Sequence, residues 1–206
     1  MEKLPEPPAR FVARGSFQTR VAGSRLWRIY FRSGKHPTRW DEFRYFGPTS
    51  SRFDHHTHPK RLQTRGILYA TSGNDAILTA LAEVFQDTRH VDRKRNRPWL
   101  VAFDLGAPLT LLDTGGRWPV RAGGNMAINL GSRTKSRAWS RTIYSSYPNA
   151  EGIWYPSSVT NLRCAALYER ASHALPTSPA LNEPLDSPKL LGGLLQLTTK
   201  LGYTLS

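Results

Sequence analysis

The chain has 206 residues, of which 39% are hydrophobic and 21% are charged, a composition typical of a globular protein. This length fits one domain with a buried core, and no run approaches the roughly 18 apolar residues of a membrane span. The first residues, MEKLPEPPAR, include acids and prolines where a signal peptide has a basic and then an apolar region. We therefore expect a cytoplasmic protein with no membrane partner.

The formal net charge is strongly positive, at +14 with histidine counted as neutral. Such an excess favours an anionic partner: nucleic acid, an acidic protein or a phosphorylated small molecule. The arginines are spread along the chain, although Arg93, Lys94, Arg95 and Arg97 form a short cluster. This cluster is compatible both with a solvated loop and with a contact surface, so charge alone names no partner.

The single cysteine, Cys164, excludes an internal disulfide and a metal site built from several cysteines. It lies in the apolar run LRCAALYE, which is typical of a strand. That setting favours a buried small side chain over a catalytic nucleophile.

The chain begins with an N-terminal arm, residues 1–24, which is punctuated by Pro and Gly and has no sustained hydrophobic period. This arm is expected either to lie on the domain or to be mobile. The domain itself is expected to span residues 25–206, beginning with a strand at Leu26–Phe31. The polar stretch Ser33–Pro48 is predicted to be mainly loop, and the turn around Arg52 is a candidate location for a site.

The clearest local unit is a strand, a turn and a helix. GILYAT, at Gly66–Thr71, is predicted to be a short buried strand, and the turn that follows offers Asn74 as a helix N-cap. A helix is predicted from Asp75, where apolar residues recur at three- and four-residue spacing. This unit puts Tyr69 near the end of a strand and Glu83 on a helix.

The rest of the chain alternates between strands, loops and helices. The predicted elements are strands at Trp99–Leu105 and Leu109–Asp113, a loop at Gly115–Gly124, a helix at Ser132–Tyr147, strands at Gly152–Tyr155 and Cys164–Tyr168, and a helix from Ser187 as N-cap through Pro188 to a stop at Gly202. The sequence has no internal repeat, and the mixture predicts an α/β fold.

Glu83 lies in TALAEVFQ between apolar neighbours. Its carboxylate belongs either to the edge of a solvated helical face, which local sequence favours, or to a partly buried functional site. A buried carboxylate needs hydrogen-bond donors. Arg52, Tyr69 and Ser157 are the side chains that could supply them.

Other motifs carry less weight. His55, His56 and His58 suggest a metal site, but no acidic or cysteine ligand follows at a motif spacing, so a polar loop is favoured. The Gly-rich segment TGGRWPVRAGGN contains neither a dinucleotide nor a phosphate-loop motif, and no serine-hydrolase elbow is present. Nucleic-acid binding would rest on charge and aromatic content alone.

Five segments taken in order resemble the RES domain, a bacterial family named for Arg, Glu and Ser. LWRIY resembles its first strand, SSRF its arginine turn, ILYAT its tyrosine strand, TALAEVF its glutamate helix and WYPSSV its Pro-Ser segment. No single one of these motifs is specific for the RES domain, but the order of all five along the chain is. The inserted DHHTHPKRLQTR, the Phe at position 53 and the neighbouring pair Ser157 and Ser158 depart from the family pattern.

The resemblance implies a fold similar to the ADP-ribosyltransferases, a mixed α/β (α+β) core with a split β-sheet and flanking helices. Many members of the family are toxins of toxin–antitoxin systems that consume NAD and are neutralised by an Xre-type antitoxin. Others transfer ADP-ribose to a protein. NAD would then be a substrate rather than a prosthetic group, no metal would be needed, and nucleic acid would be contacted only through the antitoxin.

The matched positions would have separate roles in that chemistry. Arg52 would hold the NAD diphosphate with its planar fork, and Tyr69 would present a ring face to nicotinamide or its ribose. Glu83 would stabilise the positive charge that develops as the C–N bond breaks. Ser157, or Ser158 if the match slips by one, would fix the ribose or a phosphate. Arg28, in LWRIY, is a further candidate for NAD binding.

Two alternatives to NAD cleavage remain open. One is an ADP-ribosyltransferase that acts on a host protein. The other is a non-catalytic basic module that binds nucleic acid or an acidic partner, which predicts steeply salt-dependent binding.

Overall fold

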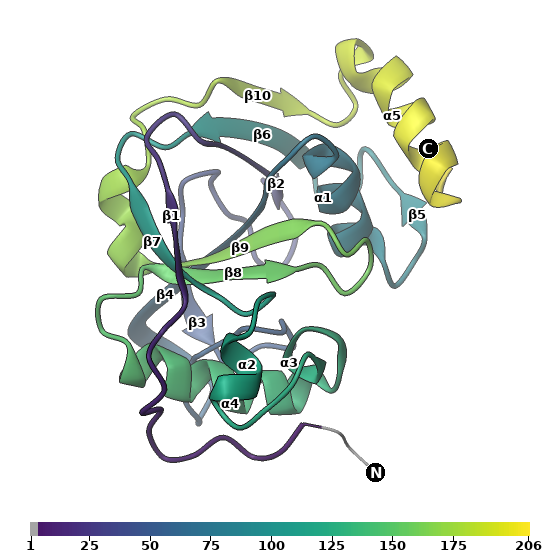
Figure 1. The fold of residues 1–206 in the computed structure, drawn as a ribbon. Helices are drawn as coiled ribbons and strands as arrows, with labels where there is room; N and C mark the ends of the chain where they lie inside the picture. The colour runs from purple at the N-terminus through teal and green to yellow at the C-terminus, as the bar shows by residue number, and fades with distance from the viewer. Residues whose placement is uncertain (1–3) are drawn as a thin grey trace.

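In a computed structural model that describes residues 4–206, the centre of the protein is a nine-stranded mixed sheet (Figure 1). In spatial order its strands are β1 (Phe17–Arg20), β7 (Leu109–Asp113), β8 (Gly152–Pro156), β9 (Arg163–Tyr168), β4 (Arg61–Thr71), β2 (Arg25–Phe31), β6 (Pro98–Asp104) and β10 (Leu181–Pro184), with β3 (Arg44–Gly47) paired to β4. Strands β7 and β8 run parallel, and the other pairs are antiparallel.

The sheet divides between β4 and β2. These strands share a single register pair, Trp27 with Thr71, whereas β2 pairs with β6 along its whole length from Arg25 to Phe31. Beyond that pair β2 and β4 separate, and β3 rather than β2 lies beside the first part of β4, from Arg61 to Ile67. The expectation of a mixed α/β fold with a large sheet and flanking helices is confirmed.

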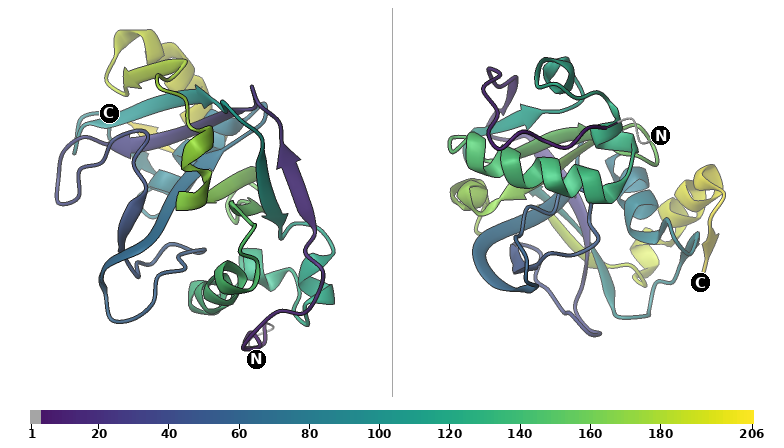
Figure 2. Two further views of the ribbon diagram at one scale, coloured as in Figure 1. Left: turned by 90° about the vertical axis from the view of Figure 1, so that its left-hand side faces the viewer. Right: turned by 90° about the horizontal axis from the view of Figure 1, so that it is seen from below.

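The helices form two separate groups (Figures 1 and 2). One group contains α1 (Ala76–Phe85) and α5 (Pro188–Leu201), beside the small sheet of β5 (His90–Val91) and β11 (Thr204–Leu205). The other contains α2 (Trp118–Arg121), α3 (Ala127–Leu130) and α4 (Arg133–Ser146). A short 3-10 helix, η1 (Glu169–Ala174), follows β9.

Helix α1 is held by its apolar face. Leu81 and Phe85 pack with Ile29 of β2 and Leu194 of α5 in one buried cluster. The apolar stripe read from the sequence therefore faces the core, as its spacing predicts, except for Val84, which is exposed and lines a cavity. The predicted ends of α5 are also confirmed, with Ser187 at the N-cap and Gly202 in the left-handed conformation at φ 65°.

The described part of the N-terminal arm lies on the domain. Leu4 and Phe11 are buried, and Phe11 packs edge-on to Trp118 and at a tilt to Trp139 in the cluster around α4. The carbonyl of Pro5 accepts a hydrogen bond from the Trp139 indole at 2.8 Å. Residues 1–3 of the predicted arm lie outside the described residues.

Three local predictions are wrong. The N-cap of α1 is Asp75 rather than Asn74. The predicted loop Gly115–Gly124 contains α2, which starts with Trp118 and Pro119 buried in the core. The predicted short strand Gly66–Thr71 is only the second half of β4, which has 11 residues and begins at Arg61. The stretch Ser33–Pro48 is mainly loop, as expected, and only Arg44–Gly47 forms a strand, β3, by pairing with β4.

Candidate active site

A cavity of about 250 Å³ opens where β2 and β4 separate. Strand β2 contributes Arg28, β4 contributes Tyr69, and α1 contributes Glu83 to its walls. The turn before β4 contributes Arg52. Side chains that are far apart in the sequence therefore meet at the division of the sheet.

Glu83 and Ser157 are in direct contact. The Ser157 hydroxyl donates a hydrogen bond of 2.6 Å to Glu83 Oε1, across 74 positions of sequence. The hydroxyl oxygen of Ser157 also accepts hydrogen bonds from the backbone N–H groups of Val159 and Thr160. The one proton and both lone pairs of Ser157 are therefore engaged. Ser157 thus orients Glu83, and Glu83 Oε2 has no hydrogen-bond partner among residues 4–206.

Arg52 is anchored at one end of its guanidinium. Its Nη1 donates to the carbonyl of Gly131 at 2.6 Å and to Ser136 Oγ at 3.2 Å. The three N–H groups on Nη2 and Nε make no hydrogen bond within residues 4–206. They form a fork that can bind two oxygens of one anion. The pKa of Arg52 is lowered, mainly by burial and also by the positive charge of Arg133. This direction is expected where two cations line one cavity and acidic groups do not balance them.

Tyr69 presents a neutral phenol to the cavity. Its hydroxyl is buried, and it has no hydrogen-bond partner within the described residues. Burial raises the pKa of Tyr69, so the phenol stays protonated at neutral pH. An unpaired buried hydroxyl costs roughly 1–3 kcal/mol, which a ligand with a polar group could recover.

Arg28 is a second guanidinium in the cavity wall. It donates through Nη1 to the carbonyl of Trp40 at 2.9 Å, while its buried Nε has no partner among residues 4–206. Burial lowers the pKa of Arg28 to about 10, which leaves the side chain charged at neutral pH. An anion in the cavity would therefore meet Arg28 and Arg52 together.

The two adjacent serines have different surroundings. Ser157 is fully buried and bonded to Glu83, whereas the half-buried Ser158 lines the cavity. Sequence reasoning missed several lining residues, and the charged one among them is Arg133, at the start of α4. The signal that could have identified Arg133 is its position in the first turn of a predicted helix, directly after the N-cap residue Ser132.

The three histidines of the insertion do not form one cluster. His55 and His56 are buried and stack on each other with ring centroids 5.3 Å apart, while His58 is exposed. His56 pairs with Asp54, and both ring nitrogens of His55 lack a partner within residues 4–206. No group of three or more His, Cys, Asp and Glu side chains in this part of the chain is placed to hold a metal ion.

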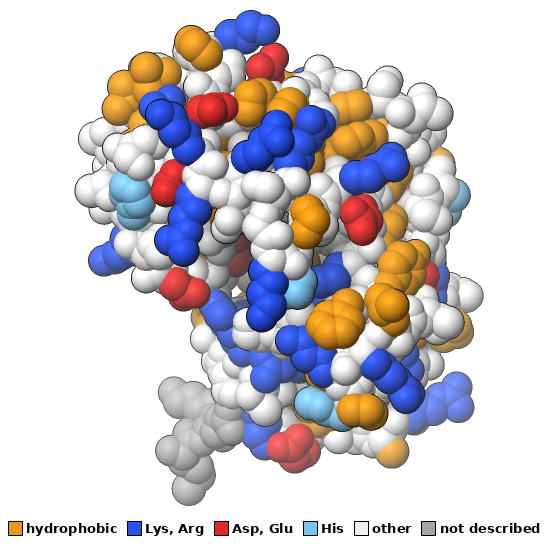
Figure 3. Space-filling view, turned by 180° about the vertical axis from the view of Figure 1, so that it is seen from behind, with side chains coloured by type: hydrophobic (Ala, Val, Ile, Leu, Met, Phe, Trp, Pro, Cys, Tyr) orange, Lys and Arg blue, Asp and Glu red, His pale blue; other side chains and the backbone are white. Residues whose placement is uncertain are grey.

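Positive charge is spread over the surface of the protein. Seen from behind, Lys and Arg side chains are spread among hydrophobic ones and outnumber the acidic side chains that lie between them (Figure 3). In the short basic cluster, Lys94, Arg95 and Arg97 are exposed, and Arg93 donates to the carbonyl of Ser206. None of the helices in residues 4–206 has the length and apolarity of a membrane span.

Comparison with known proteins adds one finding about the fold. The structure is similar to a chain in the crystal structure of the MbcT–MbcA toxin–antitoxin complex of M. tuberculosis, with a TM-score of 0.55. Identity is 15%, and the match covers 84% of this chain and 90% of that chain. The protein has a fold found in a toxin–antitoxin complex. The sequence matches no protein-family model and no curated protein.

Cys164 is expected to be chemically inert in the folded protein. Its side chain is buried, and burial followed by the charge of Glu83 raises the pKa of the thiol, so the reactive thiolate is scarce at neutral pH. Ellman's reagent should label the native protein far more slowly than the protein unfolded in guanidinium chloride. Cys164→Ser gives the blank, and rapid stoichiometric labelling of the native chain would contradict this assignment.

Proposed function

We propose that this protein is a RES-type toxin that cleaves the bond between nicotinamide and ribose in NAD. The observation that supports this most directly is that the buried Ser157 holds Glu83 in the wall of a cavity that Arg52 and Tyr69 also line. These are the positions at which the sequence resembles the RES family. The fold, which is shared with a chain of a toxin–antitoxin complex, agrees with this proposal.

The chemistry of NAD suits a site with one carboxylate. Nicotinamide leaves as a neutral molecule from a cationic ring, so the general acid of ordinary glycosidases is not required. As the bond breaks, positive charge develops on the ribose, and Glu83 would stabilise it or bind the ribose hydroxyls through its free Oε2. Ser157 would hold Glu83 in place, while Ser158 would be the serine that faces the ligand.

The size and charge of the cavity suggest how NAD would lie. At about 250 Å³ it is smaller than the roughly 300–1,000 Å³ of pockets that enclose a whole drug-sized ligand. It would therefore enclose the nicotinamide and its ribose beside Tyr69 and Glu83. The diphosphate would meet Arg28 and Arg52, and the adenosine would extend towards the surface.

The test is release of nicotinamide from NAD by the purified chain, measured against Arg52→Ala. We expect the parent protein to release nicotinamide. Removing the fork of Arg52 should reduce kcat/KM by about tenfold to a hundredfold, because a charged contact to a diphosphate contributes roughly 1.5–3 kcal/mol. If the parent protein releases no nicotinamide with or without phosphate, NAD cleavage by water or phosphate is wrong.

The acceptor of the ADP-ribosyl group would be identified in the same series. Free ADP-ribose indicates water, and a phosphorylated ADP-ribose that forms only with added phosphate indicates phosphate. Transfer of labelled ADP-ribose to a protein band in host lysate would make the protein an ADP-ribosyltransferase instead.

A toxin of this class would be paired with an antitoxin, and an Xre-type DNA-binding protein is the partner that the RES resemblance implies. The strongly basic surface would attract an acidic face on such a partner. A second candidate function, a basic module without catalysis, is favoured by this charge alone. It predicts salt-sensitive binding of nucleic acid and no growth arrest that depends on Glu83.

A further inference from the structure

The turn that carries Arg52 is closed by a buried carboxylate two residues further along. Asp54 is fully buried, and its Oδ2 accepts hydrogen bonds from the backbone N–H and the hydroxyl of Thr49, both at 2.6 Å. The Asp54 N–H also donates back to the carbonyl of Ser51 at 3.3 Å. Residues 50–53 are thereby confined to one compact loop, and Ser50, Ser51 and Arg52 of that loop line the cavity.

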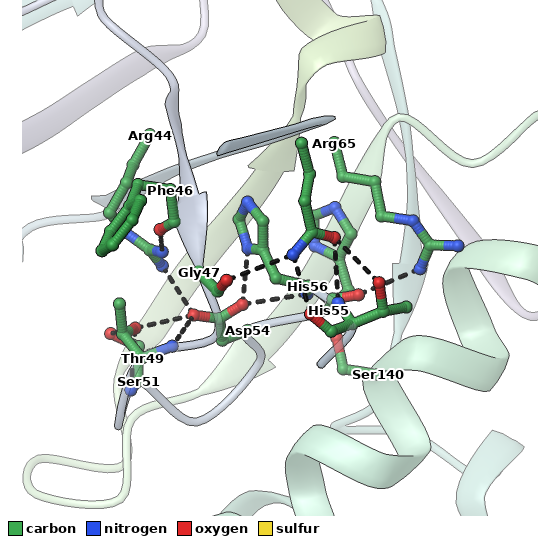
Figure 4. Close-up of polar contacts among 12 residues, drawn as sticks. Arg44, Phe46, Gly47, Thr49, Ser51, Asp54, His55, His56, Arg65 and Ser140 are labelled. Carbon is green, nitrogen blue, oxygen red and sulfur yellow. Dashed lines mark hydrogen bonds and ion pairs between the residues drawn. The ribbon is translucent and has the colours of Figure 1, made fainter. Parts of the chain in front are cut away.

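The same carboxylate joins this loop to β3 and to the residues that directly follow the loop (Figure 4). Arg44 of β3 donates to Asp54 Oδ2 at 3.0 Å, and His56 approaches Oδ1 through its backbone N–H at 3.0 Å and through Nδ1 at 2.6 Å. Burial alone would raise the pKa of Asp54, but these bonds, and the charge of Arg44, hold it well below its usual range. Because the carboxylate is ionised, the imidazole donates through Nδ1–H.

The surroundings leave this network little room to move. A Cβ on Gly47 would lie 2.4 Å from Cγ of the buried His56, so only glycine permits the close approach of β3. Phe53 is buried against Tyr155 at a centroid distance of 4.6 Å, and its carbonyl accepts a hydrogen bond from Ser140 of α4. Successive residues of the turn thus face the cavity, the core and the polar network.

We propose that Asp54, through its bonds to Thr49, Arg44 and His56, is a positioning residue that sets the backbone of the turn from which Arg52 reaches the diphosphate. The anchors at Gly131 and Ser136 fix only the tip of Arg52. Asp54 fixes the other end, the backbone that bears it. For its ligand this inference rests on the proposed function.

The test is a double-mutant cycle of Asp54→Asn and Arg52→Ala, with ADP-ribose as the probe and calorimetry as the measurement. Asparagine keeps the shape of the carboxylate but loses its charge and one acceptor oxygen. In the parent chain we expect Asp54→Asn to raise the Kd for ADP-ribose by about tenfold or more. A small displacement of the Arg52 guanidinium from the diphosphate is enough to lose much of the affinity. In the Arg52→Ala chain it should raise the Kd by less than about twofold, because Asp54 acts through Arg52.

The matched control is Asp104→Asn, which removes a carboxylate that pairs with Arg25 on the surface at 2.7 Å. It should leave the Kd unchanged. An equal loss of affinity from Asp54→Asn in both chains, or no loss in either, would overturn the inference. A merely structural role would lower the melting temperature but would not produce this dependence on Arg52.

Failure of the proposed function is distinguishable from failure of this inference. If the parent protein neither cleaves NAD nor binds ADP-ribose, the NMR signal of the Arg52 Nε–H, assigned by its loss in Arg52→Ala, decides the question. A shift in Asp54→Asn that is absent in Asp104→Asn supports positioning, and an unchanged signal rejects it. If Asp54→Asn does not fold, Thr49→Val removes one of the bonds to Asp54, and the same comparisons apply.

Discussion

Glu83→Gln is expected to reduce nicotinamide release from NAD by about a hundredfold to a thousandfold, the usual effect of losing one preorganised electrostatic contact. Glutamine has the same shape, and its carbonyl oxygen can still accept the hydrogen bond from Ser157. The substitution therefore removes the negative charge with little change in packing. The loss should appear mainly in kcat, because the charge stabilises the transition state more than the bound substrate.

The control for this prediction is Asp87→Asn, just beyond the same helix, where the side chain is exposed. It removes an equal charge and should leave the rate unchanged. Both variants should keep the circular dichroism spectrum of the parent chain. A Glu83→Gln protein that cleaves NAD at the parent rate would remove Glu83 from the chemistry.

Trp139→Ala is expected to lower the free energy of unfolding by about 3–5 kcal/mol, the usual cost of emptying a large buried aromatic site. Trp139 has no exposed surface and packs edge-on to Trp118 with ring centroids 6.1 Å apart. It also donates a hydrogen bond to the carbonyl of Pro5, which ties the N-terminal arm to α4. The arm should therefore become accessible to protease in this variant.

The measurement is urea unfolding of the parent chain, Trp139→Ala and Trp139→Phe. Phenylalanine fills part of the site but cannot donate to Pro5, so its effect should be the smaller of the two. Ser136, which helps to hold Arg52, lies one turn before Trp139 on α4, so NAD binding should weaken together with stability. A loss below about 1 kcal/mol, the average for any substitution, would mean that the arm and α4 are not packed together in solution.

The helices and strands that could be predicted from the sequence are those whose pattern and end signals lie within the element itself or directly beside it. The predicted strand Leu109–Asp113 matches β7, and α5 starts and ends at the predicted cap residues. In each case a continuous apolar pattern is bounded by proline or glycine. By contrast, β1, β3 and β10 have only four residues each and pair with a single neighbouring strand, so their form depends on that strand more than on their own residues.

The candidate site divides in the same way. The residue types at positions 52, 69, 83 and 157, and their order, could be read from the sequence through the RES resemblance. Local pattern alone favoured a solvated Glu83, but the structure places Glu83 half-buried in the cavity, within hydrogen-bonding distance of Ser157. The anchoring of Arg52 by Gly131 and the closure of its turn by Asp54 carried no sequence signal.

The sequence by itself therefore determined the mixed α/β class, the longer helices, most of the central strands, the strong positive charge and the candidate residues. Only the tertiary structure decided where the sheet divides, which of two adjacent serines holds Glu83, and which donors of Arg52 remain free for a ligand. The physical reason is the separation along the sequence over which each interaction acts. Hydrophobic period and capping act over a few residues, whereas a hydrogen bond such as that between Ser157 and Glu83 joins segments 74 positions apart, and its geometry depends on the packing of everything between them.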